Sequence, residues 1–284
     1  MSTILAISSQ VARGHVGLSA VVPAQQALGH DVIALPTVIL SNHPGHGEVA
    51  GQRIDPTLLR QMLATLDGHG WLEGVDAVLT GYLPTREHVA VAAEAVALVR
   101  RHNPASAYYC DPVLGDDPKG LYIAEDAARA LATTLVPIAD VTFPNRFELE
   151  WLSGVPVSDA ASARVAAASL GPAWTIATSV PHEGPDGAAA LATMAIGPNE
   201  AWLSAVARQD NVPNGTGDLF AALFSGYRLG GRSTERALGA AVEAIEQVIC
   251  ASRGHDELHL VAILRSLNAQ PGREPAAIPL SPAR

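Results

Sequence analysis

The sequence predicts an α/β fold with a central, mostly parallel sheet and an antiparallel hairpin at its edge. Short apolar runs rich in β-branched residues alternate with segments of helical periodicity, the pattern of βα units. The runs predicted as strands are Thr3–Ser8, Asp31–Val38, Asp76–Thr80, Ser106–Cys110, Asp140–Thr142 and Trp174–Thr178. Two later runs, Ala189–Ile196 and Ala201–Ala207, are separated by Gly197-Pro198-Asn199-Glu200, and this spacing predicts the hairpin.

Capping residues mark where several helices begin. Asp55 offers an N-cap followed by Pro56 at the first helical position, where a proline costs no hydrogen bond. Thr85 is predicted to cap a helix that runs to about Arg101, and Ser158 to cap the alanine-rich helix that follows it. Further helices are predicted over Gly217–Leu229, Thr234–Ser252 and Asp256–Leu267.

Length and composition allow a single large core. The chain has 284 residues, of which 48% are hydrophobic and 16% charged, and no linker divides it. We therefore predict one domain over residues 1–269 and a flexible, proline-rich tail over residues 270–284. The formal net charge of −10 argues against a nucleic-acid partner and requires any phosphate to be held by local groups.

Targeting and redox signals favour a cytoplasmic location. The N-terminal residues lack the basic start and long apolar run of a signal peptide. No stretch approaches the ~20 consecutive apolar residues that a membrane helix needs, so we expect no membrane partner. Cys110 and Cys250 are too few for a disulfide framework and fit a reducing environment.

The segment Asn214–Phe220 runs directly into a predicted helix and is the most informative motif. Gly215 and Gly217 allow a tight turn close to a ligand, and the start of the helix offers free N–H groups to an anion. Asp218 at this point could accept the proton of an alcohol while the N–H groups hold phosphoryl oxygens. A plain loop in which Asp218 only stabilises the helix remains an alternative for so short a match.

Two further segments place acidic residues after predicted strands. Asp111 and Asp116 follow one strand, where a parallel sheet keeps its site, and their oxygens suit Mg²⁺; a simple turn is the alternative. Glu148 follows another strand and could orient the same ion. With Asn145 three residues earlier it also forms a typical helix-capping pair, and the two roles are compatible.

In order and spacing, these motifs resemble the pyridoxal kinase family of the ribokinase-like superfamily, from Ile4 to about Leu229. The residues that carry the resemblance are Gly14-His15-Val16-Gly17, Leu40-Ser41-Asn42-His43, Thr80-Gly81-Tyr82, Asp111-Pro112-Val113-Leu114-Gly115-Asp116, Pro144-Asn145 with Phe147-Glu148, Thr178-Ser179 and Gly215-Thr216-Gly217-Asp218-Leu219-Phe220. The resemblance implies a three-layer α/β/α ribokinase-like fold, a homodimer, and ATP-dependent phosphorylation of the 5′-hydroxymethyl group of pyridoxal, pyridoxine or pyridoxamine.

The resemblance also implies a role for each matching residue. Asp218 corresponds to the catalytic base, and Gly215, Thr216 and Gly217 to the anion hole. Asn145, Thr178, Ser179 and Asn214 correspond to ATP contacts, together with Gly215 and Gly217. Asp111, Asp116 and Glu148 correspond to the region that organises Mg²⁺ and a monovalent cation such as K⁺. Ser9, Val16, Val38, His43 and Tyr82 correspond to substrate contacts, and residues 40–51 to a mobile flap.

Several positions depart from the family pattern. Pro44 stands where the flap usually has a threonine that contacts the substrate, and it removes a hydroxyl and a backbone donor. Phe143 and Arg146 replace a threonine and a glutamine that flank Pro144-Asn145. Arg146 brings a positive charge that could substitute for the monovalent cation. Gln10 and Leu18 also differ from the usual residues.

These departures keep other functions open. A kinase for another hydroxymethyl heterocycle, such as hydroxymethylpyrimidine, would use the same Gly-Thr-Gly-Asp site. A weakly active protein that binds vitamin B6 is the alternative from another class. The changes at Pro44 and Phe143 favour that alternative, and an intact Asp218 argues against it.

Overall fold

The computed structural model describes residues 1–184, 187–269 and 275–277. Its strands are β1 (Thr3–Val11), β2 (Asp31–Leu40), β3 (Gly51–Arg53), β4 (Ala77–Thr80), β5 (Ala107–Cys110), β6 (Gly115–Asp116), β7 (Gly120–Leu121), β8 (Val141–Thr142), β9 (Trp174–Glu183), β10 (Ala189–Ile196), β11 (Ala201–Ala207) and β12 (Ala276–Ala277). The α-helices are α1 (Leu18–Ala27), α2 (Pro56–Gly68), α3 (Arg86–His102), α4 (Glu125–Thr134), α5 (Arg146–Ser153), α6 (Ala160–Ala168), α7 (Thr216–Leu229) and α8 (Thr234–Ala251). Short 3₁₀ turns are η1 (Pro44–His46), η2 (Val136–Ile138), η3 (Leu260–Ala262) and η4 (Leu264–Ala269).

Within the described residues the main sheet has ten strands in the order β12-β11-β10-β9-β8-β5-β4-β1-β2-β3. From β9 to β2 the neighbouring strands run parallel. The strands β10, β11 and β12 at one edge and β3 at the other are antiparallel to their neighbours. The predicted mostly parallel sheet and its antiparallel edge hairpin are therefore confirmed.

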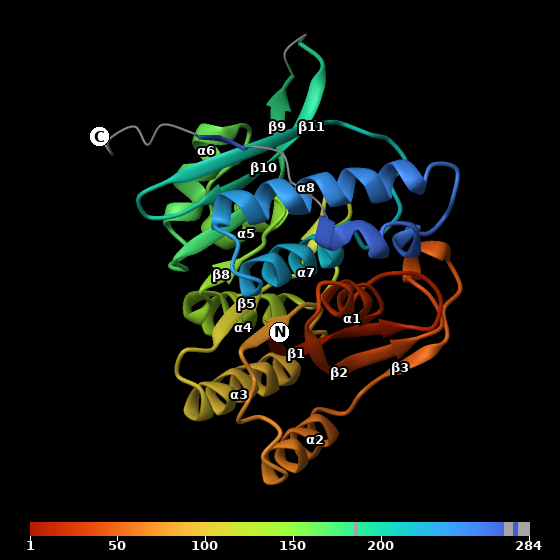
Figure 1. Ribbon diagram of the computed structural model, residues 1–284, viewed down its shortest axis with the longest axis vertical. Helices are drawn as coiled ribbons and strands as arrows, with labels where there is room; N and C mark the ends of the chain where they lie inside the picture. Colours follow the sequence, from red (N-terminus) through yellow and green to blue (C-terminus); the bar gives the residue numbers. More distant parts are fainter. Residues whose placement is uncertain (185–186, 270–274, 278–284) are drawn as a thin grey trace.

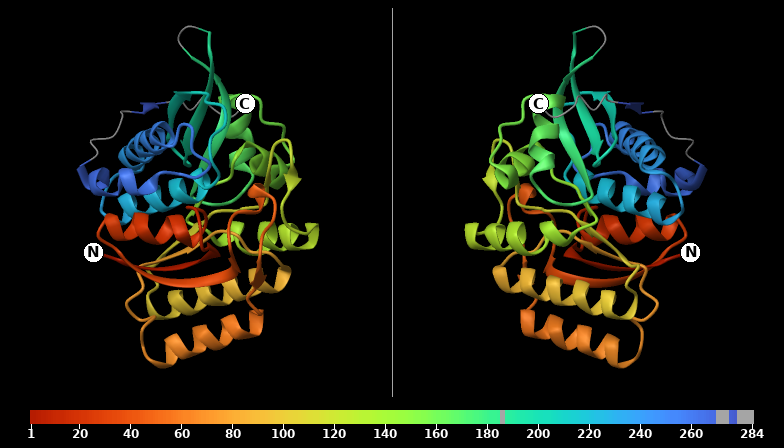
Figure 2. Two further views of the ribbon diagram at one scale, coloured as in Figure 1. Left: turned by 90° about the vertical axis from the view of Figure 1, so that its right-hand side faces the viewer. Right: turned by 90° about the vertical axis from the view of Figure 1, so that its left-hand side faces the viewer.

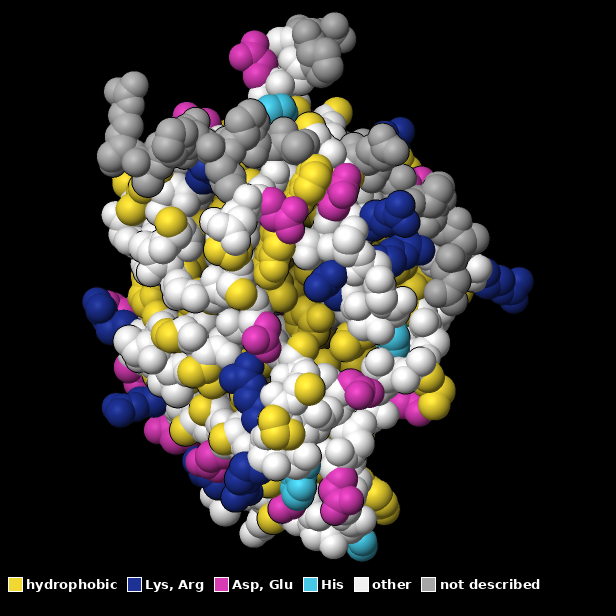
Figure 3. Space-filling model, turned by 60° about the vertical axis from the view of Figure 1, so that its left-hand side comes forward, with side chains coloured by type: hydrophobic (Ala, Val, Ile, Leu, Met, Phe, Trp, Pro, Cys, Tyr) yellow, Lys and Arg dark blue, Asp and Glu magenta, His cyan; other side chains and the backbone are white. Residues whose placement is uncertain are grey.

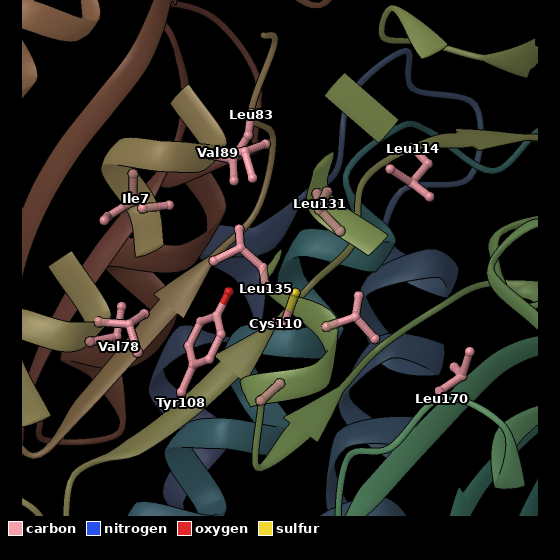
Figure 4. Packing of buried hydrophobic residues seen from close by; sticks show 14 of the residues in the cluster. Ile7, Val78, Leu83, Val89, Tyr108, Cys110, Leu114, Leu131, Leu135 and Leu170 are labelled. Carbon is pink, nitrogen blue, oxygen red and sulfur yellow. The ribbon is translucent and has the colours of Figure 1, made fainter. Parts of the chain in front are cut away.

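Helices cover both faces of this sheet, which gives the predicted three layers (Figures 1 and 2). One core lies between the sheet and α2 to α6, and Figure 4 shows part of its packing. A second core lies between the opposite face and α1, α7 and α8. The strand β1 supplies both: Leu5 and Ile7 belong to the first core, whereas Ile4 and Ala6 belong to the second.

Some local predictions are wrong. Asp159, not Ser158, caps α6, because its carboxylate accepts from Ser162 N at 2.8 Å while the Ser162 hydroxyl accepts from Asp159 N at 3.0 Å. The helix expected over Asp256–Leu267 is replaced by the 3₁₀ turns η3 and η4, although Leu260, Ile263 and Leu267 are buried at a spacing that a helix would also give. The sequence analysis also missed α1, which starts without a side-chain cap and contains Pro23.

The C-terminal segment was predicted to be flexible. Residues 276 and 277 instead form β12, in which Ala277 pairs with Trp202 and Ala276 with Leu203 of β11. Backbone pairing places these two residues against the sheet, and the flexibility of the tail stays a prediction. The remainder of the predicted tail lies outside the described residues. Of the helices in the described ranges, none is long and apolar enough to cross a membrane.

The parallel strands place the sequence motifs at one edge of the sheet. The segment 12–17 follows β1, Gly81 follows β4, Asp111 follows β5 and Asn145 follows β8. Because the carboxyl ends of parallel strands meet at the same edge, loops from distant parts of the chain converge there. The N-terminus of α7 reaches this edge as well, since a Cβ added at Gly215 would touch the carbonyl oxygen of His15.

Candidate active site

The loop before α7 brings backbone N–H groups together. Gly215 is the N-cap residue and has a φ of 100°, a left-handed conformation that favours glycine. A side chain there would place its Cβ 2.0 Å from the carbonyl oxygen of His15, so the loop packs tightly on the β1–α1 connection. Among the described residues no side chain caps α7, and its first N–H groups and positive dipole end are available to an anion.

Asp218, in the first turn of α7, lies in a small pocket. The pocket is lined by Ala6, Ser8, Leu18, Val21, Leu79, Thr80, Gly81, Asp111, Asp218 and Ala221. The pocket has room for about one water molecule. A Cβ on Gly81 would lie 2.5 Å from Ser8 Oγ and 3.8 Å from Asp218 Oδ1, which explains why glycine occupies this position.

Burial and mutual repulsion control the acidic groups of the pocket. Burial raises the pKa of Asp111 well above its usual range, and the charges of Asp218 and Glu148 raise it further. Burial also raises the pKa of Asp218, although the N–H groups of Gly17 and of Asp218 itself favour the charged form. A carboxylate with a raised pKa is a better acceptor for the proton of an alcohol.

Glu148 joins the acidic groups from the side of α5 and is only 4% exposed. Its Oε1 accepts from the N–H groups of Leu114 at 2.8 Å and Gly115 at 3.3 Å, and its Oε2 accepts from Asn145 N at 2.9 Å. Asn145 Oδ1 accepts from Glu148 N at 2.9 Å, which completes the predicted capping pair. Glu148 therefore fastens α5 to the segment that carries the other acidic residues.

The hairpin β6–β7 presents Asp116 at the surface beside this group. Its base is held by Asn145 Nδ2, which donates to Gly115 O at 2.8 Å. Arg146 forms ion pairs with Asp117 of the hairpin and with Glu150 Oε1, the latter at 2.9 Å. Burial raises the pKa of Asp116, and the positive charges of Lys119 and Arg146 are among the smaller effects that lower it.

The two residues predicted to contact nucleotide phosphates lie next to Asn145. Thr178 forms an isolated parallel bridge with Asn145 and donates its N–H to Pro144 O at 2.9 Å. Ser179 is exposed and has a φ of 57°, opposite an irregularity in the β9–β10 pairing. Such bulges redirect side chains at the edges of functional sites. The structure therefore brings Asn145, Thr178 and Ser179 together.

The predicted substrate contacts are only partly assembled at the pocket. Tyr82 is half-buried, and its N–H donates to Ser8 Oγ at 3.0 Å. Val16 and Val38 are buried, in keeping with core roles. Ser9 packs against Gly17, where a Cβ would lie 2.3 Å from Ser9 Oγ.

The pocket contains residues that the sequence analysis did not assign. Ser8 and Thr80 line it beside Asp218, whereas Ser9, the predicted serine, does not. The two serines are adjacent in β1, and successive side chains of a strand point to opposite faces. This alternation could therefore have shown that only one of the two serines faces the pocket. Leu18, noted only as a departure from the family pattern, also lines the pocket.

Phe143 belongs to the core beneath α7. It is 4% exposed and packs on Tyr109, Phe220 and Phe224 at ring-centroid distances of 5.6–6.4 Å. Its ring therefore fills space between the sheet and α7. Phe143 lacks the hydroxyl of a threonine, but its ring packs against α7, the helix that carries Asp218, and supports it.

The acidic residues suit Mg²⁺ only if water molecules and substrate phosphates supply the other ligands. Within the described part of the chain, no group of three or more His, Cys, Asp or Glu side chains is arranged to hold a metal ion by itself. Mg²⁺ usually keeps several waters and binds through one or two carboxylates plus substrate phosphates. Asp111, buried beside Asp218 and Glu148, has the oxygen ligands and the negative surroundings that such an ion requires.

Surface charge agrees with a small ligand on the side that Figure 3 shows. Lys and Arg side chains are scattered there among acidic ones and form no continuous stripe, and a central hollow is lined with hydrophobic side chains. A nucleic-acid surface would instead gather basic side chains along one path.

The fold and the glycine-and-aspartate site together define an α/β phosphotransferase. A profile of the phosphomethylpyrimidine kinase family matches residues 13–260. The chain is 36% identical over 264 residues to a pyridoxal kinase of Corynebacterium diphtheriae, covering 92% of this chain and 93% of the relative. It is 38% identical over 277 residues to a pyridoxal kinase of Rubrobacter xylanophilus, covering 96% of each.

Solved structures agree with these relatives. Pyridoxal kinase from Leishmania donovani in complex with ADP and pyridoxamine superposes with a TM-score of 0.88 at 30% sequence identity, covering 98% of this chain and 99% of that one. The chain belongs to the pyridoxal kinase family of the ribokinase-like superfamily and is an enzyme of that kind.

The packing of the anion loop, residues 215–217, can be tested by substituting its two glycines. Gly215→Ala is expected to lower the free energy of unfolding by about 2–4 kcal/mol, because Cβ would collide with His15 O and φ is positive. Gly217→Ala should change it by less than about 1 kcal/mol, because nothing lies within 4 Å of the added Cβ. Urea unfolding measures both, and equal losses would contradict the packing described here.

The raised pKa of Glu148 predicts that the difference in free energy of unfolding between wild type and Glu148→Gln depends on pH. Burial raises its pKa from 4.5 to about 8, so between these values the folded state holds a proton that the unfolded state has released. This carboxyl therefore costs stability increasingly as the pH rises from 5 to 8. Glu148→Gln should be less stable than wild type at pH 5, because it loses one acceptor, and this deficit should shrink by about 2–4 kcal/mol at pH 8. Urea unfolding curves of both proteins at pH 5 and pH 8 measure this deficit. A deficit that is the same at both pH values would refute the raised pKa of Glu148.

Proposed function

We propose that this enzyme transfers the terminal phosphoryl group of ATP to the 5′-hydroxymethyl group of pyridoxal, pyridoxine or pyridoxamine. The observation that carries the proposal is Asp218, which lies in a pocket with Ser8 and Asp111 and directly follows the Gly215–Gly217 loop. The relatives named pyridoxal kinase, and the Leishmania donovani enzyme with ADP and pyridoxamine, support the substrates.

In the proposed mechanism Asp218 acts as general base. Burial raises its pKa, which strengthens it as an acceptor for the hydroxymethyl proton while the oxygen attacks the terminal phosphorus of ATP, the bond to the bridging oxygen breaks and ADP leaves. The N–H groups of Gly215, Thr216 and Gly217 would hold the phosphoryl oxygens at the positive end of α7. Phosphoryl transfer depends mainly on positioning and charge stabilisation, and these groups would supply both at the attacking oxygen and the transferred phosphoryl group.

The nucleotide would lie along the loop that follows β8 and the irregular part of β9 that contains Thr178 and Ser179. Asn145, Thr178 and Ser179 are adjacent there, and Asn214 precedes the anion loop. Asp111 and Asp116 are the proposed Mg²⁺ residues, with Glu148 fixing the segment between them. Mg²⁺ would neutralise the phosphate charge that this acidic region otherwise repels.

Two other activities remain as alternatives. The profile of the phosphomethylpyrimidine kinase family keeps a hydroxymethylpyrimidine kinase open, since the same base and anion loop would serve. A weakly active B6-binding protein would fit the loss of the flap threonine at Pro44. We also propose a cytoplasmic homodimer, as the family resemblance implies, which a molar mass of about twice 29.4 kDa by light scattering would support.

The primary test is ATP-dependent phosphorylation of the three vitamers and hydroxymethylpyrimidine. A vitamer is expected to turn over best, and Asp218→Asn should reduce kcat by about 10²–10⁴-fold because the base is lost. Calorimetric titration with pyridoxal should show that the variant still binds. Preferred turnover of hydroxymethylpyrimidine would select the first alternative. Tight vitamer binding without ATP consumption in the wild type would select the second.

Arg146 leads to a prediction about K⁺. Its ion pair with Asp117 holds a positive charge beside the acidic hairpin, so we expect K⁺ to stimulate the wild type by less than about twofold over Na⁺. Arg146→Gln removes that charge and should increase the stimulation. Initial rates in matched KCl and NaCl buffers measure both, and equal stimulation of the two proteins would rule out the substitution of K⁺ by Arg146.

A further inference from the structure

Residues 40–51, which connect β2 to β3, form a flap whose base is closed by hydrogen bonds. Ser41 N donates to Ala50 O at 2.7 Å, and Ala50 N donates to Ser41 Oγ at 3.0 Å. At the tip, His43 Nδ1 accepts from Gly45 N at 3.0 Å and caps the turn η1. A Cβ added at Gly45 would lie 3.1 Å from Asn214 Nδ2. The tip therefore rests against the residue that precedes the anion loop.

Glu257, in the segment that follows α8, holds the tip of the flap. His46 Nε2 lies 2.9 Å from Glu257 Oε1, and Figure 1 shows the flap, between β2 and β3, beside the blue segment that follows α8. The Glu257 side chain is 12% exposed and that of His46 is 24% exposed. Both side chains are thus mostly covered by neighbouring residues, although residue 46 as a whole lies on an exposed loop.

The surroundings of Glu257 are shaped to receive its carboxylate. Gly14, with a φ of 100°, leaves the space: a Cβ there would lie 2.4 Å from Glu257 Oε2. Arg13 Nη1 is 3.3 Å from Glu257 Oε1, but its Nη2 is 2.9 Å from Asp256 Oδ2 and 3.0 Å from Asp256 Oδ1. Arg13 is therefore engaged more closely by Asp256, which leaves His46 as the nearest partner of Glu257.

We infer that Glu257 is a positioning residue that latches the flap over the active site through His46. The latch joins the flap, the β1–α1 connection and the segment after α8, three parts that meet only in the folded chain. The inference rests on the proposed function in taking the flap as the cover of the substrate. A single partly exposed pair is weak enough to break in each turnover, as a cover that must admit substrate and release product requires.

Hydrogen exchange of the free, full-length protein tests the latch without any substrate. Glu257→Gln and His46→Ala are each expected to raise the exchange rate of backbone amides in residues 41–50 by about three- to tenfold, because the closed state loses its tie. Asp256→Asn is the matched control: it removes the neighbouring carboxylate and leaves the His46 contact in place, so these amides should exchange as in the wild type. In the double variant the effects should not add, since both changes break one contact.

Two outcomes would overturn the latch: unchanged exchange in the flap, or a rise spread over the whole sheet, which would mark a general loss of stability. His46→Ala keeps the test decisive if Glu257→Gln does not fold, because His46 lies on an exposed loop.

A second measurement connects the latch to binding. The dissociation rate of pyridoxal, followed by its absorbance in stopped flow, should rise about three- to tenfold in both variants and stay unchanged in Asp256→Asn. Unchanged dissociation would show that the flap does not confine the ligand and would overturn the inference. If the two variants show faster amide exchange than the wild type but the wild type phosphorylates no vitamer, the proposed function is refuted while the latch contact stands.

Discussion

The site depends on keeping several carboxylates together where water is scarce. Burial raises the pKa of Asp111, Glu148 and Asp218, and the charges of Asp218 and Glu148 raise that of Asp111 further. Three backbone N–H groups on Glu148 and the N–H groups around Asp218 offset part of this rise. The remaining negative charge suits a metal ion and a nucleotide that arrive together, because each then neutralises the other.

The two cores explain how loops from distant parts of the chain keep this arrangement. The strand β1 contributes to both cores, and the loops that follow β1, β4, β5 and β8 leave the sheet from one edge. Phe143 fills the space between the sheet and α7, the helix that begins at the anion loop. Positioning of Asp218 therefore rests on apolar packing as much as on its own hydrogen bonds.

Much of this could be predicted from the sequence, for physical reasons. Strand periodicity predicted the sheet, and the order of the motifs predicted which loops meet. The alternation of side chains along β1 could have separated Ser8, which lines the pocket, from Ser9, but it does not say which of the two faces belongs to the pocket until the neighbouring loops are placed. Contacts between remote segments, such as that of Arg146 with Asp117, leave no local pattern. The segment after α8 was mistaken for a helix because Leu260, Ile263 and Leu267 follow a helical spacing, whereas the backbone forms 3₁₀ turns that bury the same residues.

The short outer strands have a consequence for the protein in a crowded cell. An exposed sheet edge offers unpaired N–H and C=O groups to other chains and can start aggregation. Here β12 pairs with part of β11 at one edge, and the other edge ends in β3, a three-residue strand that carries Arg53. Among the described residues, β12 pairs only with Trp202 and Leu203 of β11, and β3 only with residues 38–40 of β2, so the rest of β11 and of β2 is where another chain could pair.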